Sequence, residues 1–380
     1  DVPVAPSQRS GIPPGCGGRP AGFVGVRRGP EGQLPGRLVG VSKDADGNPA
    51  YRLSLQTREQ HIRREKATSA ITTAQVLLAV MAAMYAVYHG PDGLTRIGRT
   101  VADRTASLAD LLRRSGFDLV SDSFFDTLEV RATGSAGDIA ASLAEAGYLV
   151  HTVDDDLVHL SLDETVTAAD LEAIAAAFAP HAPDPGQEVA EVASGAGWEG
   201  LVREDPFLQH PVFSSFPSET AMMRYLRRLG DRDFALDRGM IPLGSCTMKL
   251  NAATEMAGIT WAGFSAVHPF APREDVEGYL EMITQLEIWL ADLTGYDTVS
   301  LQPNAGSQGE FAGLLAIRAY HASRGEGGRD VCLVPSSAHG TNAASAVIAG
   351  LRVVVVASDA HGNIDLDDLK QKIKDHGEEL

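Results

Sequence analysis

The stretch VSLQPNAGSQGEFAGLLAIRAY, residues 299–320, decides the fold class that we predict for this chain. Its apolar start favours a β-strand, its small polar residues favour a turn, and the run that follows predicts a long helix. A strand, a turn and a helix N-terminus together form a common phosphate site, because backbone N–H groups and the helix dipole both attract an anion there. We therefore expect an anion site at the start of this helix.

Two well-known phosphate-binding loops do not fit this stretch. A P-loop would require a lysine at the position of Glu310. A dinucleotide-binding loop would require Gly-x-Gly-x-x-Gly, whereas the glycines here lie three and four residues apart. Ser307 and Gln308 remain as side-chain donors at a helix N-terminus, which suits a compact phosphomonoester. An ordinary capped helix after a strand stays open as the alternative on this stretch alone.

A second polar loop, PSSAHGTNAASA (335–346), follows the next predicted strand. His339 stands just beyond the C-terminal end of that strand, which is where ligands bind in open α/β sheets. A lone histidine in such a place is more often structural. A histidine flanked by Ser337, Gly340, Thr341 and Asn342, on the loop next to a phosphate site, is better explained as lining a pocket.

Strands and helices alternate from residue 296 onward, which predicts a parallel α/β sheet. The β-leaning runs are DVCLVPSS (330–337) and RVVVVAS (352–358), and the helical runs are NAASAVIAG (342–350) and DLDDLKQKI (365–373). We expect the sheet to be unfinished at Leu380.

The earlier part of the chain has a different pattern. Residues 35–59 predict a hairpin around Asp46, Gly47 and Asn48, and residues 58–116 are mostly helical with a turn at HGPDG (89–93). Residues 117–179 predict strand, helix, two strands and helix, the order of a small α+β subdomain. A Pro/Gly/Ala-rich linker is expected at 180–200, and a strong amphipathic helix ending in glycine at 273–295.

Composition excludes several function classes. The formal net charge of −18 argues against sequence-independent nucleic-acid binding, which needs a basic face. The three cysteines, Cys16, Cys246 and Cys332, are far apart and have no metal-ligand spacing, so we expect neither a metal site nor a disulfide framework. The longest apolar run, residues 74–88, is shorter than the roughly 20 residues that span a bilayer. No signal-peptide pattern opens the chain.

Seven long motifs carry a close resemblance to glycine decarboxylase, the pyridoxal-phosphate (PLP)-dependent P-protein family of the glycine cleavage system. They include LQPNAGSQGEFAGLLAIRAYH, PSSAHGTNAASA and MIPLGSCTMKLNAATEM, and they cover most of the chain: 34–69, 73–94, 210–229, 240–256, 268–272, 301–321 and 335–346. The chain resembles an internal fragment of that family, spanning the end of a first half and the start of a catalytic half.

The resemblance implies a fold-type-I PLP-dependent transferase architecture built as two homologous halves, of which the first is degenerate. On that frame, residues 1–90 are the tail of the first-half large domain with connecting helices, and 91–180 are its small α+β subdomain. Residues 181–204 are a linker. Residues 205–380 are the truncated N-terminal part of the PLP-binding domain of the catalytic half, an incomplete parallel α/β large domain.

The resemblance also implies a set of site residues. The phosphate loop of the family falls on Ser307 and Gln308, the imidazole that stacks on the cofactor ring falls on His339, and Thr341 and Asn342 lie in the same pocket. Weaker candidates for lining the active site are Ser245, Cys246 and His268. For Cys246, a small buried apolar-like role is at least as good an interpretation.

No match is found for the lysine with which the family forms its Schiff base. It belongs to a His-Lys motif beyond the phosphate loop, and no such motif occurs between Ala343 and Leu380. Lys370, Lys372 and Lys374 belong to an acidic amphipathic helix and are expected on a solvated face. We therefore assign no catalytic residue within this chain.

The family's reaction is the decarboxylation of glycine, with transfer of the aminomethyl group to the lipoyl arm of the H-protein. The resemblance thus implies PLP as cofactor, glycine as substrate, lipoylated H-protein as partner and a homodimer for the intact protein. It implies a cytoplasmic location in a bacterium or the mitochondrial matrix in a eukaryote. We expect no nucleic-acid or membrane partner.

Three hypotheses follow for the isolated chain. The first is a decarboxylase fragment that is inactive alone. The second is a non-catalytic or split subunit, completed by a second chain that supplies the Schiff-base lysine. The third is another fold-type-I enzyme such as a hydroxymethyltransferase, which the motif QTREQHIRREKATS (56–69) argues against because a single-half enzyme has no place for it.

Overall fold

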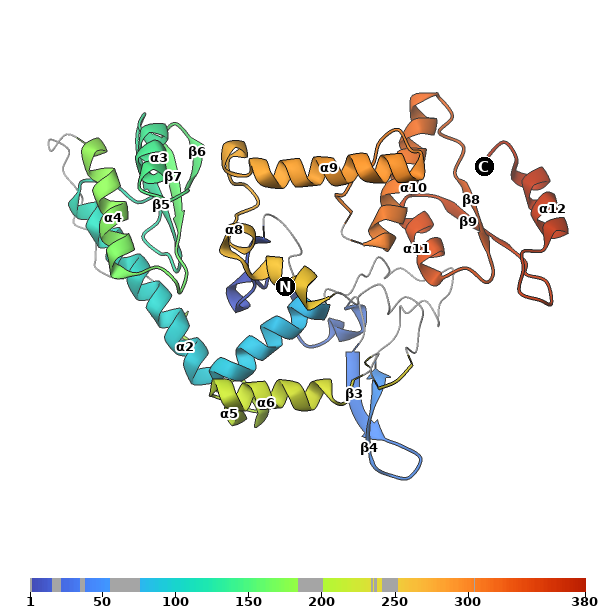
Figure 1. Cartoon of the computed structure of the whole chain (residues 1–380), viewed down its shortest axis with the longest axis horizontal. Helices are drawn as coiled ribbons and strands as arrows, with labels where there is room; N and C mark the ends of the chain where they lie inside the picture. The colour runs from blue at the N-terminus through green and yellow to red at the C-terminus, as the bar shows by residue number, and fades with distance from the viewer. Residues whose placement is uncertain are drawn as a thin grey trace. The chain divides into compact units, whose positions relative to one another are not determined.

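The computed structural model describes most of the chain (Figure 1). The described residues are 2–15, 22–34, 38–54, 76–183, 201–233, 235, 238–240, 252–303 and 305–380. The chain divides into two compact units, each described separately below. One comprises Asp1–Pro6, Gly18–Val76 and Pro272–Leu380, and the other comprises Ser7–Gly17 and Leu77–Ala271. The expected domain boundaries at residues 90, 180 and 204 remain predictions.

A long, bent helix organises the second unit. Helix α2 runs from Val76 to Arg114 and bends sharply at Gly90, which has φ 61° and ψ −178° (Figure 1). Pro91 follows at once, where its missing N–H costs nothing because it opens a new helical turn. The break falls inside the predicted turn at residues 89–93, although the chain resumes its helix immediately.

We predict that Gly90→Ala destabilises this unit by at least about 2 kcal/mol. The backbone conformation of Gly90 is one that essentially only glycine adopts, and forcing another residue into it costs about 1–3 kcal/mol. A Cβ at this position would also lie 2.5 Å from the backbone carbonyl oxygen of Phe213, which cannot move as a side chain would. The free energy of unfolding from urea titration measures the effect.

Gly137→Ala is the matched control for this substitution. Gly137 lies in a regular helix, and a Cβ there meets nothing within 4 Å. The control should leave stability unchanged or raise it slightly, because alanine is the better helix former. Equal stabilities for the two variants would contradict the proposed strain at Gly90.

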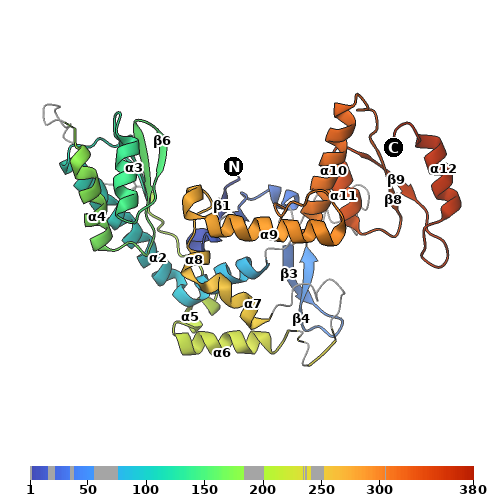
Figure 2. The ribbon, with the colours of Figure 1, turned by 45° about the horizontal axis from the view of Figure 1, so that its top comes forward.

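Beyond α2, the second unit contains the strand–helix–strand–strand–helix order expected from the sequence. Its elements are β5 (Thr127–Arg131), α3 (Ala136–Glu145), β6 (His151–Asp154), β7 (Leu157–Ser161) and α4 (Ala168–Phe178). The three strands form an antiparallel sheet in the order β5-β7-β6, with Val130 paired to Val158. Figure 2 shows α3 and α4 beside this sheet.

One apolar core holds these elements to the second arm of α2. Strand positions alternate between buried and exposed, so one face of the sheet is covered and the other meets solvent. Thr167 caps α4 with a complete capping box, in which Asp170 is the partner residue. The largest fully buried apolar side chains are Leu108, Leu112, Phe117, Leu128, Val130, Ile139, Leu143, Val158 and Phe178.

Shorter elements complete the second unit. Ser218 caps α6 by accepting a hydrogen bond from the Ala221 N–H through its hydroxyl. Most of the expected linker, residues 184–200, lies outside the described residues. The short elements are η1 (Gln8–Ser10), η5 (Ala179–His181), α5 (Val212–Ser215), α6 (Glu219–Gly230), α7 (Ala253–Ala257), η8 (Gly258–Thr260) and α8 (Ala262–Ser265).

The first unit begins with two small antiparallel pairs. Strands β1 (Val4–Pro6) and β2 (Gly22–Val24) pair, and the 3-10 helix η3 (Pro30–Gln33) follows. The predicted hairpin is confirmed as β3 (Leu38–Lys43) and β4 (Pro49–Ser54).

The turn between β3 and β4 has a local physical cause. The Asp44 carboxylate accepts hydrogen bonds from the N–H groups of Asp46 and Asn48, at 2.9 and 2.8 Å. Gly47 takes a positive φ of 85° there, which few other residues tolerate.

The C-terminal part of the first unit has the predicted α/β alternation. Strands β8 (Val331–Pro335) and β9 (Arg352–Val356) pair in parallel, joined by α11 (Gly340–Ile348). The amphipathic helix is confirmed as α9 (Glu277–Thr294), which ends at Gly295 with φ 75°. The remaining elements are η9 (Arg273–Asp275), α10 (Gly306–Ser323) and α12 (Leu366–His376). The described part of the chain is therefore mixed α/β.

The strand expected at the start of the opening stretch does not form. Residues 299–303 are irregular, and neither β8 nor β9 pairs with them. Local side chains bond their backbone instead: the Leu301 N–H donates to Glu287 Oε1, and the Gln302 N–H donates to Ser300 Oγ, both at 3.3 Å. The prediction was wrong because β propensity does not make a strand without a neighbouring strand.

Across the described ranges, no helix combines the length and the apolar content that a bilayer crossing requires.

Candidate functional site

The predicted phosphate loop forms the first turn of α10. Ala305 is extended, with φ −163° and ψ 165°, and the helix begins at Gly306. The Gly309 N–H donates to the Ala305 carbonyl oxygen at 2.9 Å, which closes the first turn. Ser307 and Gln308 therefore lie in that turn, half-buried, at the positive end of the helix dipole. The site's helix is as predicted, although the strand before it is not.

His339 forms the start of the neighbouring helix, α11. It is the N-cap residue, and its Nδ1 accepts a hydrogen bond from the Thr341 N–H at 3.2 Å. This bond orients the exposed ring and makes Nδ1 an acceptor, so the proton of the neutral imidazole lies on Nε2. The sequence predicted the helix here but not that His339 would be its cap.

Glu310 joins the two helices. Its Oε1 accepts a hydrogen bond from Asn342 Nδ2, and its Oε2 accepts one from Ser345 Oγ at 3.5 Å. Both views show α10 and α11 side by side (Figures 1 and 2). The amide nitrogen of Asn342, which we predicted in the pocket, is thus bonded within the protein. This bridge links α10, just after Ser307 and Gln308, to the start of α11, which His339 caps.

Apolar packing supports the same junction. Ala346, Ala349 and Leu351 are buried against Phe311 and Leu314 of α10. Cys332 of β8 packs there as well, and burial, followed by the nearby Glu310 charge, raises the pKa of its thiol. A raised thiol pKa leaves Cys332 mostly protonated at neutral pH, which argues for a packing role and against a nucleophilic one.

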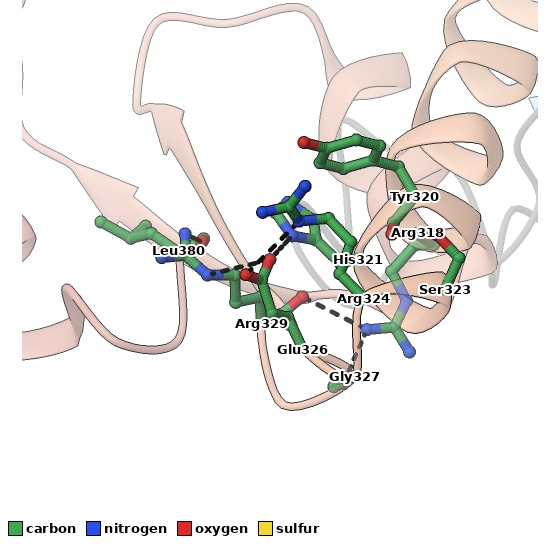
Figure 3. A network of polar contacts seen from close by, with 9 residues as sticks. All are labelled: Arg318, Tyr320, His321, Ser323, Arg324, Glu326, Gly327, Arg329 and Leu380. Atoms are coloured by element: carbon green, nitrogen blue, oxygen red, sulfur yellow. Dashed lines mark hydrogen bonds and ion pairs between the residues drawn. The ribbon is translucent and has the colours of Figure 1, made fainter.

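The far end of α10 is held by a separate polar network (Figure 3). His321 Nδ1 and Glu326 Oε2 lie 2.9 Å apart, and this hydrogen bond is the largest cause that lowers the pKa of Glu326. Arg318 donates to the carbonyl oxygens of Gly327 and Arg329, both at 3.3 Å. These bonds tie the end of α10 to the loop before β8.

The three weaker candidates remain predictions. Ser245 and Cys246 lie outside the described residues. His268 belongs to the other unit, where its Nδ1 accepts a hydrogen bond from the Phe270 N–H at 3.1 Å. Its part in lining an active site stays a prediction.

The lysines near the C-terminus are placed on α12. Lys370 and Lys374 are exposed, and Lys370 pairs with Asp367 at 3.4 Å. Lys372 on the same helix is half-buried. Within the ranges described, no cluster of three or more His, Cys, Asp or Glu side chains is arranged to hold a metal ion.

Sequence reasoning missed Glu310, the residue that joins the two loops. An acidic residue near the start of a helix is explained by the helix dipole alone, so its type and position gave no separate signal. Its hydrogen-bond partners lie 32 and 35 residues further along the chain.

Comparisons with known proteins agree with the motifs. The family model of the glycine cleavage system P-protein matches residues 1–178. A glycine dehydrogenase (decarboxylating) of Cutibacterium acnes is 61% identical over 373 residues, which are 98% of this chain and 37% of the relative. One of the same name from Xanthomonas euvesicatoria is 56% identical over 380 residues, 100% of this chain and 39% of the relative.

A solved structure is also similar. It is a crystal structure of glycine decarboxylase, the P-protein of the glycine cleavage system, in inhibitor-bound form. It is 32% identical, the match covers 48% of this chain and 43% of the other, and the TM-score is 0.43. The chain spans about two fifths of the length of the curated relatives that it matches. High identity over almost all of its residues nevertheless shows that the chain belongs to the P-protein family of the glycine cleavage system.

Proposed function

We propose that this chain supplies the loops that bind the phosphate and ring of PLP in a glycine decarboxylase. The observation that carries the proposal is the Glu310 bridge, which places the first turn of α10 beside the first turn of α11. Ser307 and Gln308 would hold the phosphate, and the imidazole of His339 would lie against the ring. The names of the relatives, glycine dehydrogenase (decarboxylating), support glycine as the substrate.

The residues present fit a phosphorylated aromatic ligand. A phosphate needs donors and a positive potential, which the start of α10 offers through Ser307, Gln308 and the helix dipole. The flat His339 ring is exposed and is already oriented by its bond to Thr341. The Glu310 charge would oppose an anion, but both of its oxygens accept hydrogen bonds from α11. Its carboxylate is thus directed toward Asn342 and Ser345.

In this proposal the protein binds PLP, orients its ring and shields it from water. PLP, when bound, supplies the electron sink for loss of CO2 from glycine. Thr341 and Asn342 would line the proposed pocket, and the family resemblance adds Ser245, Cys246 and His268 as weaker candidates. The transfer of the aminomethyl group to the lipoyl arm of H-protein, a homodimer, and a cytoplasmic or mitochondrial location belong to the same proposal. So do the fold-type-I architecture and the division into first-half and catalytic-half domains.

We further propose that the 380 residues alone bind PLP without a covalent bond and do not decarboxylate glycine. No lysine occurs between residues 299 and 348, where the two candidate loops lie. The lysines described on α12 belong to a largely solvated face. The second candidate function is a split subunit, in which another chain provides the Schiff-base lysine.

Borohydride trapping tests this proposal. The purified chain, mixed with one equivalent of PLP, should bind the cofactor by fluorescence titration and release it on dialysis. Reduction with borohydride should leave no stoichiometric PLP on any one peptide, because full attachment requires a positioned lysine. Unfolded chain treated in the same way reports the non-specific labelling of accessible lysines.

Two outcomes distinguish the alternatives. Stoichiometric trapping of PLP on one lysine of the folded chain would contradict non-covalent binding. Glycine decarboxylation that returns on co-expression with a second chain carrying the Schiff-base lysine would favour the split subunit.

A further inference from the structure

Glu310 contacts the second helix at two positions on one face. Asn342 and Ser345 are three residues apart, so their side chains project from the same side of α11. One carboxylate oxygen accepts from each of them. Ser345 is fully buried, and a buried hydroxyl without a partner would cost stability. The carboxylate therefore binds α11 at a defined position along its axis.

The surrounding apolar contacts do little to fix the position of α11 along its axis. Helix α11 has nine residues, too few to be stable alone, and its buried apolar side chains are those of Ala344 and Ala346. Alanine side chains are small and alike, so sliding α11 by one turn would lose little contact area. A directional hydrogen bond favours one position of the helix over another more strongly than small apolar side chains do.

The Glu310 bridge is connected to His339 through hydrogen bonds of the α11 backbone. The Asn342 N–H donates to the His339 carbonyl oxygen at 3.0 Å, and the Thr341 N–H donates to His339 Nδ1 at 3.2 Å. Fixing the Asn342 side chain thus fixes the first turn of α11 and the ring that caps it. At its other end, Glu310 lies three residues beyond Ser307 and two beyond Gln308, on the same helix.

We propose that Glu310 is a positioning residue, which holds the His339 ring of α11 in register with the Ser307–Gln308 turn of α10. The inference rests on the proposed PLP-binding function, which does not itself assign a role to Glu310. Glu310 acts as a hydrogen-bond acceptor in this role, and its charge is not required. Glutamine can still accept from Asn342 through its carbonyl oxygen and can donate to the Ser345 hydroxyl.

The test compares Glu310→Ala, Glu310→Gln and Asn342→Ala in the full 380-residue chain. Hydrogen exchange of the amides of residues 340–348 reports the order of α11 without any ligand. Fluorescence titration with PLP reports the site. Glu281→Ala is the matched control, because Glu281 also accepts a side-chain amide hydrogen bond, from Gln285, but does so within α9.

Glu310→Ala should speed exchange in α11 and weaken PLP binding by up to about tenfold, the effect of losing one hydrogen bond. Asn342→Ala should act in the same direction, and the Glu310→Ala/Asn342→Ala double variant should be no worse than the worse single variant. Glu310→Gln should restore most of the exchange protection and of the affinity. The Glu281→Ala control should match the wild type in both measurements.

The failures of the two proposals are distinguishable. Absence of PLP binding by the wild-type chain would overturn the proposed function. Normal PLP binding by a folded Glu310→Ala variant would overturn the positioning role alone. So would an unchanged exchange rate in α11. If Glu310→Ala does not fold, the Asn342→Ala variant decides. PLP affinity and α11 exchange rates equal to those of the wild type in that variant would overturn the positioning role.

Discussion

Replacing both Ser307 and Gln308 with alanine is expected to weaken PLP binding by about a hundredfold or more. A hydrogen bond to a charged group contributes about 1.5–3 kcal/mol, and the double variant removes two such donors from the proposed phosphate site. The two losses do not add fully, since both donors would contact one phosphate group. Residual affinity should come from the backbone N–H groups and dipole of α10, which alanine leaves in place.

Comparison of PLP with pyridoxal makes this experiment specific to the phosphate. Pyridoxal has the same ring without the phosphate, so its weaker affinity should hardly change in the double variant. Ser323→Ala/Gln371→Ala is the matched control, because it removes the same two side-chain types from the end of α10 and from α12. A variant that still prefers PLP over pyridoxal as strongly as the wild type would exclude Ser307 and Gln308 as the phosphate donors.

Phe178→Ala is expected to lower the free energy of unfolding of the second unit by about 3–5 kcal/mol, the usual cost of deleting a buried phenylalanine. Phe178 is the last residue of α4, and its side chain is fully buried. Its ring meets that of Phe117 edge to face, with centroids 5.1 Å apart. Alanine would leave a cavity between α4 and the end of α2 and would also remove this ring contact.

Urea unfolding followed by far-UV circular dichroism measures this loss. Phe125→Ala is the matched control, because Phe125 lies in the same unit with half of its side chain exposed. The control should change stability by well under half as much, since the hydrophobic contribution scales with buried area. A Phe117→Ala/Phe178→Ala double variant that loses less than the sum of the single variants would confirm that the two rings act together. Similar losses for Phe178→Ala and Phe125→Ala would refute the packing account.

Sequence patterns predicted the elements whose causes are local. The Gly47 turn of the hairpin and the glycine that ends α9 both lie within a few residues of the structure that they produce. The strand expected from residue 299 failed for the opposite reason. Its formation depends on a neighbouring strand, and β propensity contains no information about one.

The features of the candidate site also divide into those with local causes and those that depend on residues distant in the sequence. The two helices themselves, α10 and α11, were predictable, because small polar residues before a helical run have local consequences. Their meeting depends on Glu310, Asn342 and Ser345, whose hydrogen bonds join separate helices. Without the neighbouring helix in view, Glu310 is an ordinary acidic residue and Asn342 an ordinary polar one. The assignment of PLP itself came from the family resemblance.

The Glu310–Asn342 bridge spans only 32 residues of chain, whereas the bond from Arg9 to the Leu162 carbonyl in the other unit spans 153. Loop-closure entropy grows with the logarithm of loop length, so the shorter closure costs about 1.4 kcal/mol less. Contacts between near neighbours in sequence also form faster during folding. The part of the proposed site that lies between Ser307 and Ser345 is therefore expected to form early, before the segments that are most distant in the chain have met.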